Sequence, residues 1–265
     1  MKNGETVMTK KEFTQIMESF CPNALAEPWD NCGFQINSDI EHVKKVLVAL
    51  EVTSKVIHEA IECGADLIVT HHPLIFGGIK TIDASDVTGG FISKLIKNDI
   101  SVYSCHTSFD KMDGGNNDYI GQLLDLENIR AFDYDNGFCR KGETPFETTF
   151  GELIHQVSLG FQVEERFFNT VGDMRKSINC IGWCSGSGGE FIRDAVNEGC
   201  DLFITGDVKY HDAMYAMEKE ICVLDAGHFG SEKIFVENMA DILRYKFKDY
   251  DTEIIESLVD INPFV

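Results

Sequence analysis

Two stretches of the chain repeat one helix–glycine–strand pattern, and this repetition limits the available folds more than any other feature. Residues 59–70 (EAIECGADLIVT) align with residues 194–205 (DAVNEGCDLFIT) at one fixed offset. In each stretch, a glycine placed to end a helix in the left-handed conformation precedes an apolar strand. The positions that are identical, in the numbering of the first stretch, are Ala60, Gly64, Asp66, Leu67 and Thr70.

A second match follows the first in the same order. Residues 105–110 (CHTSFD) parallel residues 227–232 (GHFGSE), and each segment comes after a strand-like run. Helix–glycine–strand units look alike in any α/β protein, but two ordered matches favour an internal duplication. Since short apolar runs alternate with helical patterns throughout, we expect an α/β fold of two related lobes whose equivalent strand ends face one cleft.

Caps and apolar periodicity place the expected elements, beginning with the capping box of Thr9–Glu12. Helices are expected at 9–20, 53–63, 91–97, 118–124, 150–159, 190–198, 210–218 and 231–247. Strands are expected at 46–50, 66–70, 101–105, 179–184, 201–205, 221–225 and 253–258, the last at a sheet edge. Because residues 127–150 are polar and turn-rich, we place a boundary there, with lobe 1 formed by 1–126 plus 233–265 and lobe 2 by 127–232.

The charge balance excludes several kinds of partner. The chain has 44 acidic and 23 basic residues, a formal charge of -21, so nucleic acids and anionic membranes are not expected partners, whereas metal cations are. No apolar run approaches the roughly 18 residues of a membrane helix, and the first residues lack a signal-peptide core. The nine cysteines include no C-x-x-C pair. We therefore expect a soluble cytoplasmic protein with reduced thiols.

Histidines and carboxylates follow three of the expected strands, at the strand ends where open α/β sheets bind ligands. His71 and His72 follow the strand ending at Thr70, and two further pairs are spaced four residues apart, so that both members share one helix face. These pairs are His106 with Asp110 and His228 with Glu232. A lone histidine is more often a core residue, but this combination favours a metal site of Zn²⁺, Fe²⁺, Mn²⁺ or Co²⁺. These side chains offer more ligands than one tetrahedral zinc ion with an open position can use. Two ions that share Asp110 as a bridge would use them all.

Two other segments are candidates for contacting a substrate. Ser185–Gly189 lies between a strand and a helix, where backbone N–H groups bind anions, although no Walker sequence is present and a tight turn fits equally well. The segment around Trp29 combines an aromatic ring with polar side chains, and its alternative is a capped turn. The candidate residues are Trp29, Asp30, Asn31, Gly186, Gly188, Gly189 and, in the expected cleft, His211.

Five segments together resemble the NIF3-like (DUF34) family, whose bacterial members are often named GTP cyclohydrolase 1 type 2 homologues. They are EPWDNCGFQ (27–35), HHPL (71–74), HTSFD (106–110), GDVKYH (206–211) and GHFGSE (227–232). The segments span nearly the whole chain in the family's order. The chain resembles the short form, without the domain that some members insert between the halves.

The resemblance implies two related lobes, a dinuclear metal centre in their cleft and a toroidal homohexamer. It carries over the metal ligands His71, His72, Asp110, His228 and Glu232, while His106 either ligates or orients a ligand. The chain departs from the family pattern at Ser108 and Phe109, and at Glu51, where the family usually has Asp and where a substrate contact is in question.

Two classes of function remain open. The first is a metal-dependent hydrolase, in which two ions activate a water molecule; the resemblance implies ring-opening hydrolysis of a guanine nucleotide, and phosphoester hydrolysis is the nearest competitor. The second is a non-enzymatic hexamer that binds or delivers metal. No nucleophile motif stands out, and the sequence assigns neither the catalytic acid or base, the metal, nor the substrate.

Overall fold

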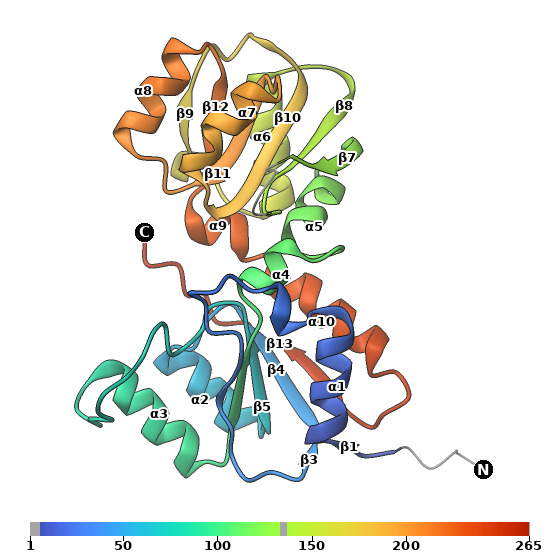
Figure 1. Cartoon of the computed structure of the whole chain (residues 1–265), viewed down its shortest axis with the longest axis vertical. Coiled ribbons are helices and arrows are strands. Elements are labelled where there is room, and N and C mark those ends of the chain that lie inside the picture. The colour runs from blue at the N-terminus through green and yellow to red at the C-terminus, as the bar shows by residue number, and fades with distance from the viewer. Residues whose placement is uncertain (1–5, 133–136, 265) are drawn as a thin grey trace. The chain divides into compact units, whose positions relative to one another are not determined.

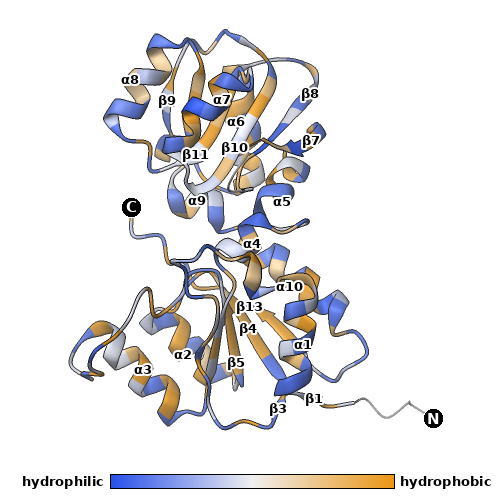
Figure 2. Cartoon of the chain, viewed as in Figure 1, coloured by the Kyte–Doolittle hydropathy of each residue, from blue (hydrophilic) through white to orange (hydrophobic). Residues whose placement is uncertain are grey.

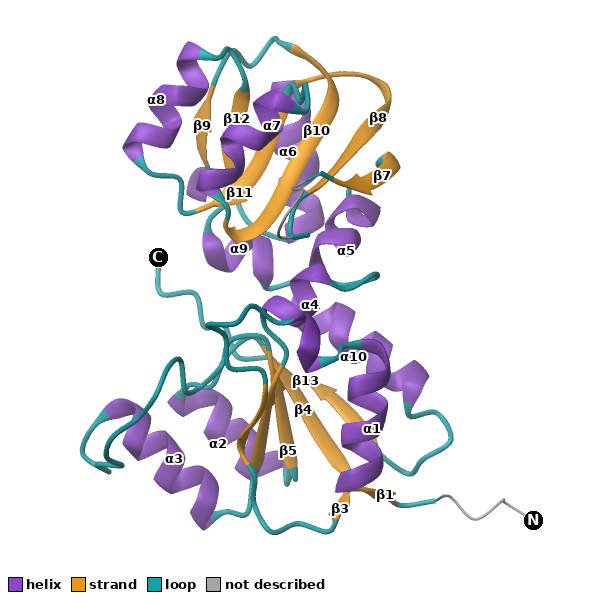
Figure 3. Ribbon diagram, viewed as in Figure 1, coloured by secondary structure: helices purple, strands orange, loops and turns teal. Residues whose placement is uncertain are grey.

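Each half of the chain folds around its own β-sheet in the computed structural model, which describes residues 6–132 and 137–264. Two compact units form, one from Met1–Met112 with Phe235–Val265 and the other from Asp113–Ile234 (Figure 1). In both units helices lie on the two faces of the sheet (Figure 3). The expected α/β fold of two related lobes is therefore confirmed.

The sheet of the first unit has five strands in the order β13-β4-β5-β6-β2. Its strands are β13 (Glu253–Glu256), β4 (Lys45–Ala49), β5 (Leu67–Thr70), β6 (Ser101–Ser104) and β2 (Gly33–Ile36). Only β2 runs antiparallel to its neighbour. One face packs against α2 (Ser54–Cys63) and α3 (Val87–Lys97), and the other against α1 (Lys10–Phe20) and α10 (Phe235–Lys246). A short helix, α4 (Thr107–Lys111), follows β6, and β1 (Met8–Thr9) pairs with β3 (His42–Val43).

The sheet of the second unit has six strands in the order β7-β8-β10-β11-β12-β9. They are β7 (Glu127–Ala131), β8 (Arg140–Thr149), β10 (Ser177–Ser187), β11 (Leu202–Gly206), β12 (Cys222–Asp225) and β9 (Asn169–Val171). The central strands β10, β11 and β12 are parallel, and the outer ones are antiparallel. One face packs against α5 (Asn116–Leu123) and α6 (Phe150–Phe161), the other against α7 (Ile192–Asn197) and α8 (Tyr210–Glu218), and α9 (His228–Glu232) follows β12.

Local sequence signals explain why many of these elements begin and end where they do. Thr9 and Glu12 form the expected capping box of α1, and Gly64 ends α2 with a φ of 70°. Apolar residues concentrate in the strands and on the helix faces that cover them (Figure 2). In the described part of the chain, no helix is long and apolar enough to span a bilayer.

The internal repeat corresponds to the same set of hydrogen bonds in both units. The Asp66 carboxylate accepts the N–H groups of Lys44 and Lys45 at 2.8 and 2.9 Å, and the Asp201 carboxylate accepts those of Asn179 and Cys180 at 3.0 and 2.9 Å. Each aspartate thus joins the start of one central strand to the turn before the next. Such identical side-chain roles at matched positions support duplication over a chance likeness of two α/β units.

Three details differ from the sequence-based expectations. Residues 127–150 contain strands β7 and β8 rather than a turn-rich boundary, and the first unit ends at Met112 because α5 packs on the second sheet. The predicted final helix is two helices, α9 and α10. The predicted loop at 185–189 is in part strand, since β10 continues to Ser187.

We predict that Asp201→Ala destabilises the second unit by about 1 kcal/mol, because two backbone N–H groups of β10, one exposed and one partly buried, lose their carboxylate acceptor. Urea unfolding of this variant in a Trp29→Phe background follows the second unit alone, since Trp183 is then the remaining tryptophan. Asp201→Asn keeps an acceptor oxygen, so this variant should lose less stability than Asp201→Ala. Replacing Asp113, an exposed carboxylate of the same unit, with Ala should change stability by less than about 0.5 kcal/mol, and equal losses for Asp201→Ala and Asp113→Ala would contradict this role.

Candidate metal centre

The turn after β5 fixes the position of two adjacent histidines. The N–H groups of His71 and His72 both donate to the carbonyl oxygen of Leu50, at 3.1 and 3.0 Å. The Thr70 hydroxyl donates to the carbonyl oxygen of His72 at 2.9 Å. Because Pro73 cannot donate to a strand ladder, the chain leaves the sheet here, and the two imidazoles project from the carboxyl end of β5.

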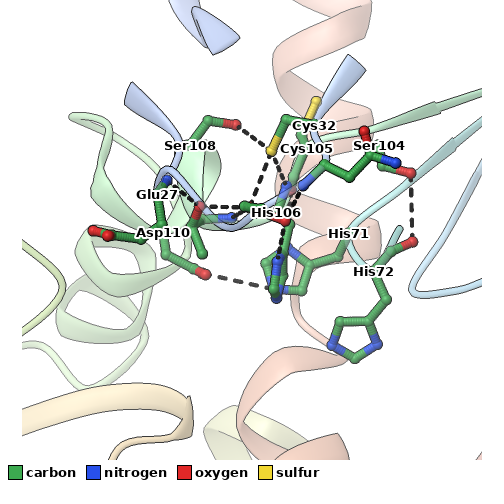
Figure 4. Close-up of polar contacts among 12 residues, drawn as sticks. Glu27, Cys32, His71, His72, Ser104, Cys105, His106, Ser108 and Asp110 are labelled. Carbon is green, nitrogen blue, oxygen red and sulfur yellow. Dashed lines mark hydrogen bonds and ion pairs between the residues drawn. The ribbon is translucent and has the colours of Figure 1, made fainter. Parts of the chain in front are cut away.

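Three imidazoles gather at this end of the first sheet. Ligand atoms of His71, His72 and His106 all lie within 4.8 Å of one another. Their ring centroids are between 5.1 and 5.7 Å apart. His71 is fully buried, whereas His72 and His106 are partly exposed. Figure 4 shows the three side chains together with Asp110. The arrangement brings together three of the side chains that the strand-end pattern singled out.

Each of these rings has its Nδ1 atom next to an acceptor. His71 Nδ1 lies 3.0 Å from the carbonyl oxygen of Cys105, and His106 Nδ1 lies 3.0 Å from Asp30 Oδ1. His72 Nδ1 is 3.4 Å from Glu51 Oε2. Because carbonyl and carboxylate oxygens only accept, a neutral imidazole in this position has its hydrogen on Nδ1, and its Nε2 then has the lone pair that can bind a metal. This is the orientation that metal-ligating histidines have in proteins.

Asp110 adds a carboxylate to the same cluster. It lies on α4, four residues after His106, and its Oδ1 is 3.7 Å from His71 Nε2. The side chain is almost fully buried, as expected for a residue that faces the sheet end rather than solvent. The cluster therefore combines imidazole nitrogens with a carboxylate oxygen, a donor set suited to a divalent transition metal.

Asp30 holds both His106 and the start of α4. Its carboxylate accepts hydrogen bonds from His106 Nδ1, from the Thr107 N–H at 3.0 Å and from the Thr107 hydroxyl at 2.5 Å. Burial opposes ionisation of Asp30, but the hydrogen bonds from His106 and Thr107 outweigh it and keep the pKa of this carboxyl well below its usual range. The sequence suggested a substrate contact for Asp30, whereas its fully buried side chain positions His106.

The second unit carries a smaller cluster on α9. His228 Nε2 lies 3.0 Å from Glu232 Oε2, and His228 Nδ1 lies 2.8 Å from Asp207 Oδ2. Glu232 is buried and His228 is partly exposed. His228 is thus oriented in the same way as the histidines of the first unit, with a carboxylate on Nδ1 and Nε2 turned toward a second ligand.

The loop between the strand end and the histidine is one residue longer in the second unit than in the first. The Cys105 N–H donates to the Thr70 carbonyl, and the Ala226 N–H donates to the Thr205 carbonyl, so Cys105 and Ala226 are equivalent by register. His106 is then the N-cap of α4, whereas Gly227 caps α9 and His228 is its first residue. Gly227, with a φ of 76°, is an additional residue in the second unit.

The glycine-rich segment makes room for Glu232. A Cβ atom at Gly186 would lie 2.1 Å from Glu232 Oε1, and the φ of Gly186 is 67°. The N–H groups of Gly186 and Gly188 donate to the hydroxyls of Ser231 and Thr205, both at 2.9 Å. Since these donors are engaged within the unit, and Gly189 lies beside the Asp212 carboxylate, packing explains the segment better than anion binding.

The remaining candidates lie at different distances from the clusters. Trp29 is 57% exposed, and its ring centroid is 5.9 Å from that of Phe76 and 6.1 Å from that of His106. Asn31 Nδ2 donates to the Ile75 carbonyl at 2.8 Å, which holds the local loop. His211 is exposed on the first turn of α8, against Tyr210.

Sequence reasoning did not identify Asp207 or the Cys105 carbonyl as partners of the histidines. Asp207 follows β11 directly and belongs to the segment 206–211 already noted, so its position at a strand end was the available signal. A backbone carbonyl leaves no signal of this kind in a sequence.

Comparisons with known proteins identify the family of this chain. The model of the family described as Duf34/NIF3 (NGG1p interacting factor 3) matches residues 8–263. Proteins of Streptococcus pneumoniae and Clostridium perfringens, both named "GTP cyclohydrolase 1 type 2 homolog", are 35% identical and cover 97% of this chain and 99% of their own.

Solved structures show the same fold. Staphylococcus aureus hypothetical protein SA1388 superposes with a TM-score of 0.92 at 26% identity, covering 98% of this chain and 99% of that one. Reduced HcgD from Methanocaldococcus jannaschii has a TM-score of 0.82 at 30% identity, covering 96% of this chain and 100% of that one.

We predict that Gly186→Ala weakens Zn²⁺ binding about 10- to 100-fold, because the added methyl group displaces the Glu232 carboxylate. Isothermal titration with Zn²⁺ measures the loss. Gly199→Ala is the matched control, since Gly199 has a φ of 72° but nothing within 4 Å of the added Cβ. Both variants should lose about 1 kcal/mol of stability from backbone strain. Equal Zn²⁺ affinities in the two variants would show that Glu232 does not bind the ion.

Proposed function

Because this chain belongs to the Duf34/NIF3 family, we propose that it is a metal-dependent hydrolase with a dinuclear metal centre. One observation supports this more than any other. Four histidines, His71, His72, His106 and His228, each have Nδ1 beside an oxygen acceptor, which leaves Nε2 for a metal ion. A core histidine needs no such common orientation.

The donors fit two divalent ions of the Zn²⁺, Fe²⁺, Mn²⁺ or Co²⁺ type. In the proposed centre His71, His72, Asp110, His228 and Glu232 would hold the ions, and the Asp110 carboxylate would be shared between them. His106, which Asp30 holds in place, ligates or orients a neighbouring ligand. The set contains nitrogen and oxygen atoms only, which favours these ions over the softer metals that thiolates select.

Ions held by these residues would lower the pKa of a bound water toward neutrality and polarise the bond under attack. The chain's own groups supply the rest of the proposed chemistry. Asp30 and Glu51 keep the rings of His106 and His72 in a fixed tautomer. Trp29 and Phe76 offer exposed aromatic surface beside His106, on which a planar purine can stack. We therefore propose a guanine nucleotide or a related compound as substrate and ring-opening hydrolysis as the reaction, in line with the names of the relatives.

A second candidate is a non-enzymatic protein that binds or delivers metal. The partial exposure of His72 and His228 favours it, since exposed ligands allow an ion to exchange. Phosphoester hydrolysis, which uses similar paired metals, is the competing enzymatic activity.

We predict that Asp110→Ala lowers turnover by at least about 100-fold, because the variant would lose a carboxylate that both ions need. Metal-loaded protein is assayed with GTP and a panel of phosphoesters. The control is Asp113→Ala, an exposed carboxylate in the same stretch of chain, which should keep full activity. Turnover that survives Asp110→Ala would refute the hydrolase, and stoichiometric, readily exchanged metal without any turnover would favour delivery.

We also propose a toroidal homohexamer, as the family resemblance implies. Light scattering on the eluting protein should give a mass six times that of the 29.7 kDa chain. A monomeric or dimeric mass at micromolar concentration would contradict this assembly.

A further inference from the structure

The second unit contains two thiols in contact, away from the histidine clusters. Cys180 lies on β10 and Cys200 in the turn before β11, and their sulfur atoms are 3.9 Å apart. The two strands are parallel neighbours, with Ile181 opposite Leu202. Cys180 is partly buried, whereas Cys200 belongs to the core beneath α7 and α8 and is 8% exposed.

Gly182 provides the space in which the two sulfurs meet. It lies two residues after Cys180 and therefore on the same face of β10. A Cβ atom at Gly182 would lie 3.0 Å from Cys200 Sγ and 3.2 Å from the ring of Phe203. Any larger residue at this position would push the Cys200 sulfur away.

The fold itself does not require thiols at these positions. By the internal repeat, Cys180 corresponds to Lys45 and Cys200 to Ala65 in the first unit. The backbone bonds are the same in both units, since the Ala65 N–H donates to the Ala60 carbonyl and the Cys200 N–H to the Ala195 carbonyl. The dithiol is therefore an addition to the shared framework.

The surroundings favour ionisation of one of the two thiols. The hydrogen bond with Cys200 lowers the pKa of Cys180 to about 7, against the effect of burial and with help from the charge of Lys141. Lys141 is itself held by an ion pair with Glu198 at 2.6 Å. A thiolate that is partly exposed and lies beside a second thiol has the features of redox-sensitive cysteines.

We propose that Cys180 and Cys200 form a peroxide-reactive dithiol that closes reversibly to a disulfide. The Cys180 thiolate attacks one oxygen of the peroxide, the O–O bond breaks, and hydroxide leaves and is protonated to water. Cys180 is then a sulfenic acid. The Cys200 sulfur attacks this sulfur, the S–S bond forms, the S–O bond breaks, and a second water leaves with the Cys200 proton. The two thiols supply the two electrons that reduce the peroxide.

The test treats the reduced full-length protein with one equivalent of hydrogen peroxide, alkylates the remaining thiols and maps the peptides by mass spectrometry. We expect a peptide linking Cys180 to Cys200, loss of alkylation at both residues, and recovery of both after dithiothreitol. Cys63, a partly buried thiol beside the Ala60 carbonyl, should stay alkylated and serves as the internal control.

Two variants separate this chemistry from a change in folding. Cys200→Ala introduces alanine, the residue at the equivalent position of the first unit, so the second unit should still fold. Without its partner thiol, Cys180 should accumulate as a sulfenic acid, which dimedone traps. Cys63→Ser should form the Cys180–Cys200 link as the unsubstituted protein does. The proposal is overturned if both thiols remain alkylated after peroxide, if Cys180 reaches the sulfinic acid without a link, or if the disulfide joins other cysteines.

Discussion

The candidate site depends on one kind of interaction, an oxygen acceptor placed against Nδ1 of each histidine in the two clusters. An imidazole that is free to rotate and change tautomer is a poor ligand, because binding must first fix both. Here the Cys105 carbonyl and the carboxylates of Glu51, Asp30 and Asp207 do so in advance. Asp30 shows how far this pre-organisation extends, since the same carboxylate also caps the helix that carries Asp110.

These acceptors lie in fixed positions because the turns at the strand ends are short and are hydrogen-bonded to the strands. Two backbone N–H groups on one Leu50 carbonyl leave the turn after β5 little freedom, and the aspartates at 66 and 201 join the starts of adjacent strands. Duplication of this framework gave each unit a strand end with a histidine and a carboxylate. The glycine at 186 shows the adaptation that followed, since it accommodates a carboxylate specific to the second unit.

Much of the fold could be predicted from the sequence because its signals are local. The capping box at Thr9 and the left-handed Gly64 mark helix ends, and continuous apolar runs mark buried parallel strands. Strand β8 was not predicted because its sequence is polar. Arg140 and Lys141 are buried in this strand, where they form ion pairs with Asp118 and Glu198 of other elements. Such pairing is invisible in one sequence.

The placement of the histidines at the ends of strands could likewise be predicted, but their orientation could not. It depends on a backbone carbonyl and on side chains from distant segments, and only the folded chain brings these together. The predicted substrate contacts at Asp30 and at residues 186–189 depend on the same kind of information. In the structure the Asp30 side chain is buried beside His106, and the N–H groups of Gly186 and Gly188 donate to side-chain hydroxyls.

The extra residue at Gly227 has a consequence for the symmetry of the molecule. Counted from equivalent strand ends, Asp110 and Glu232 stand one position apart along the chain, and their side chains differ by one methylene group. The longer carboxylate side chain, Glu232, therefore belongs to the unit with the longer loop. The two halves are therefore not interchangeable. A chimera that carries one strand–loop–helix segment on the other sheet would combine a loop of one length with a carboxylate side chain suited to the other.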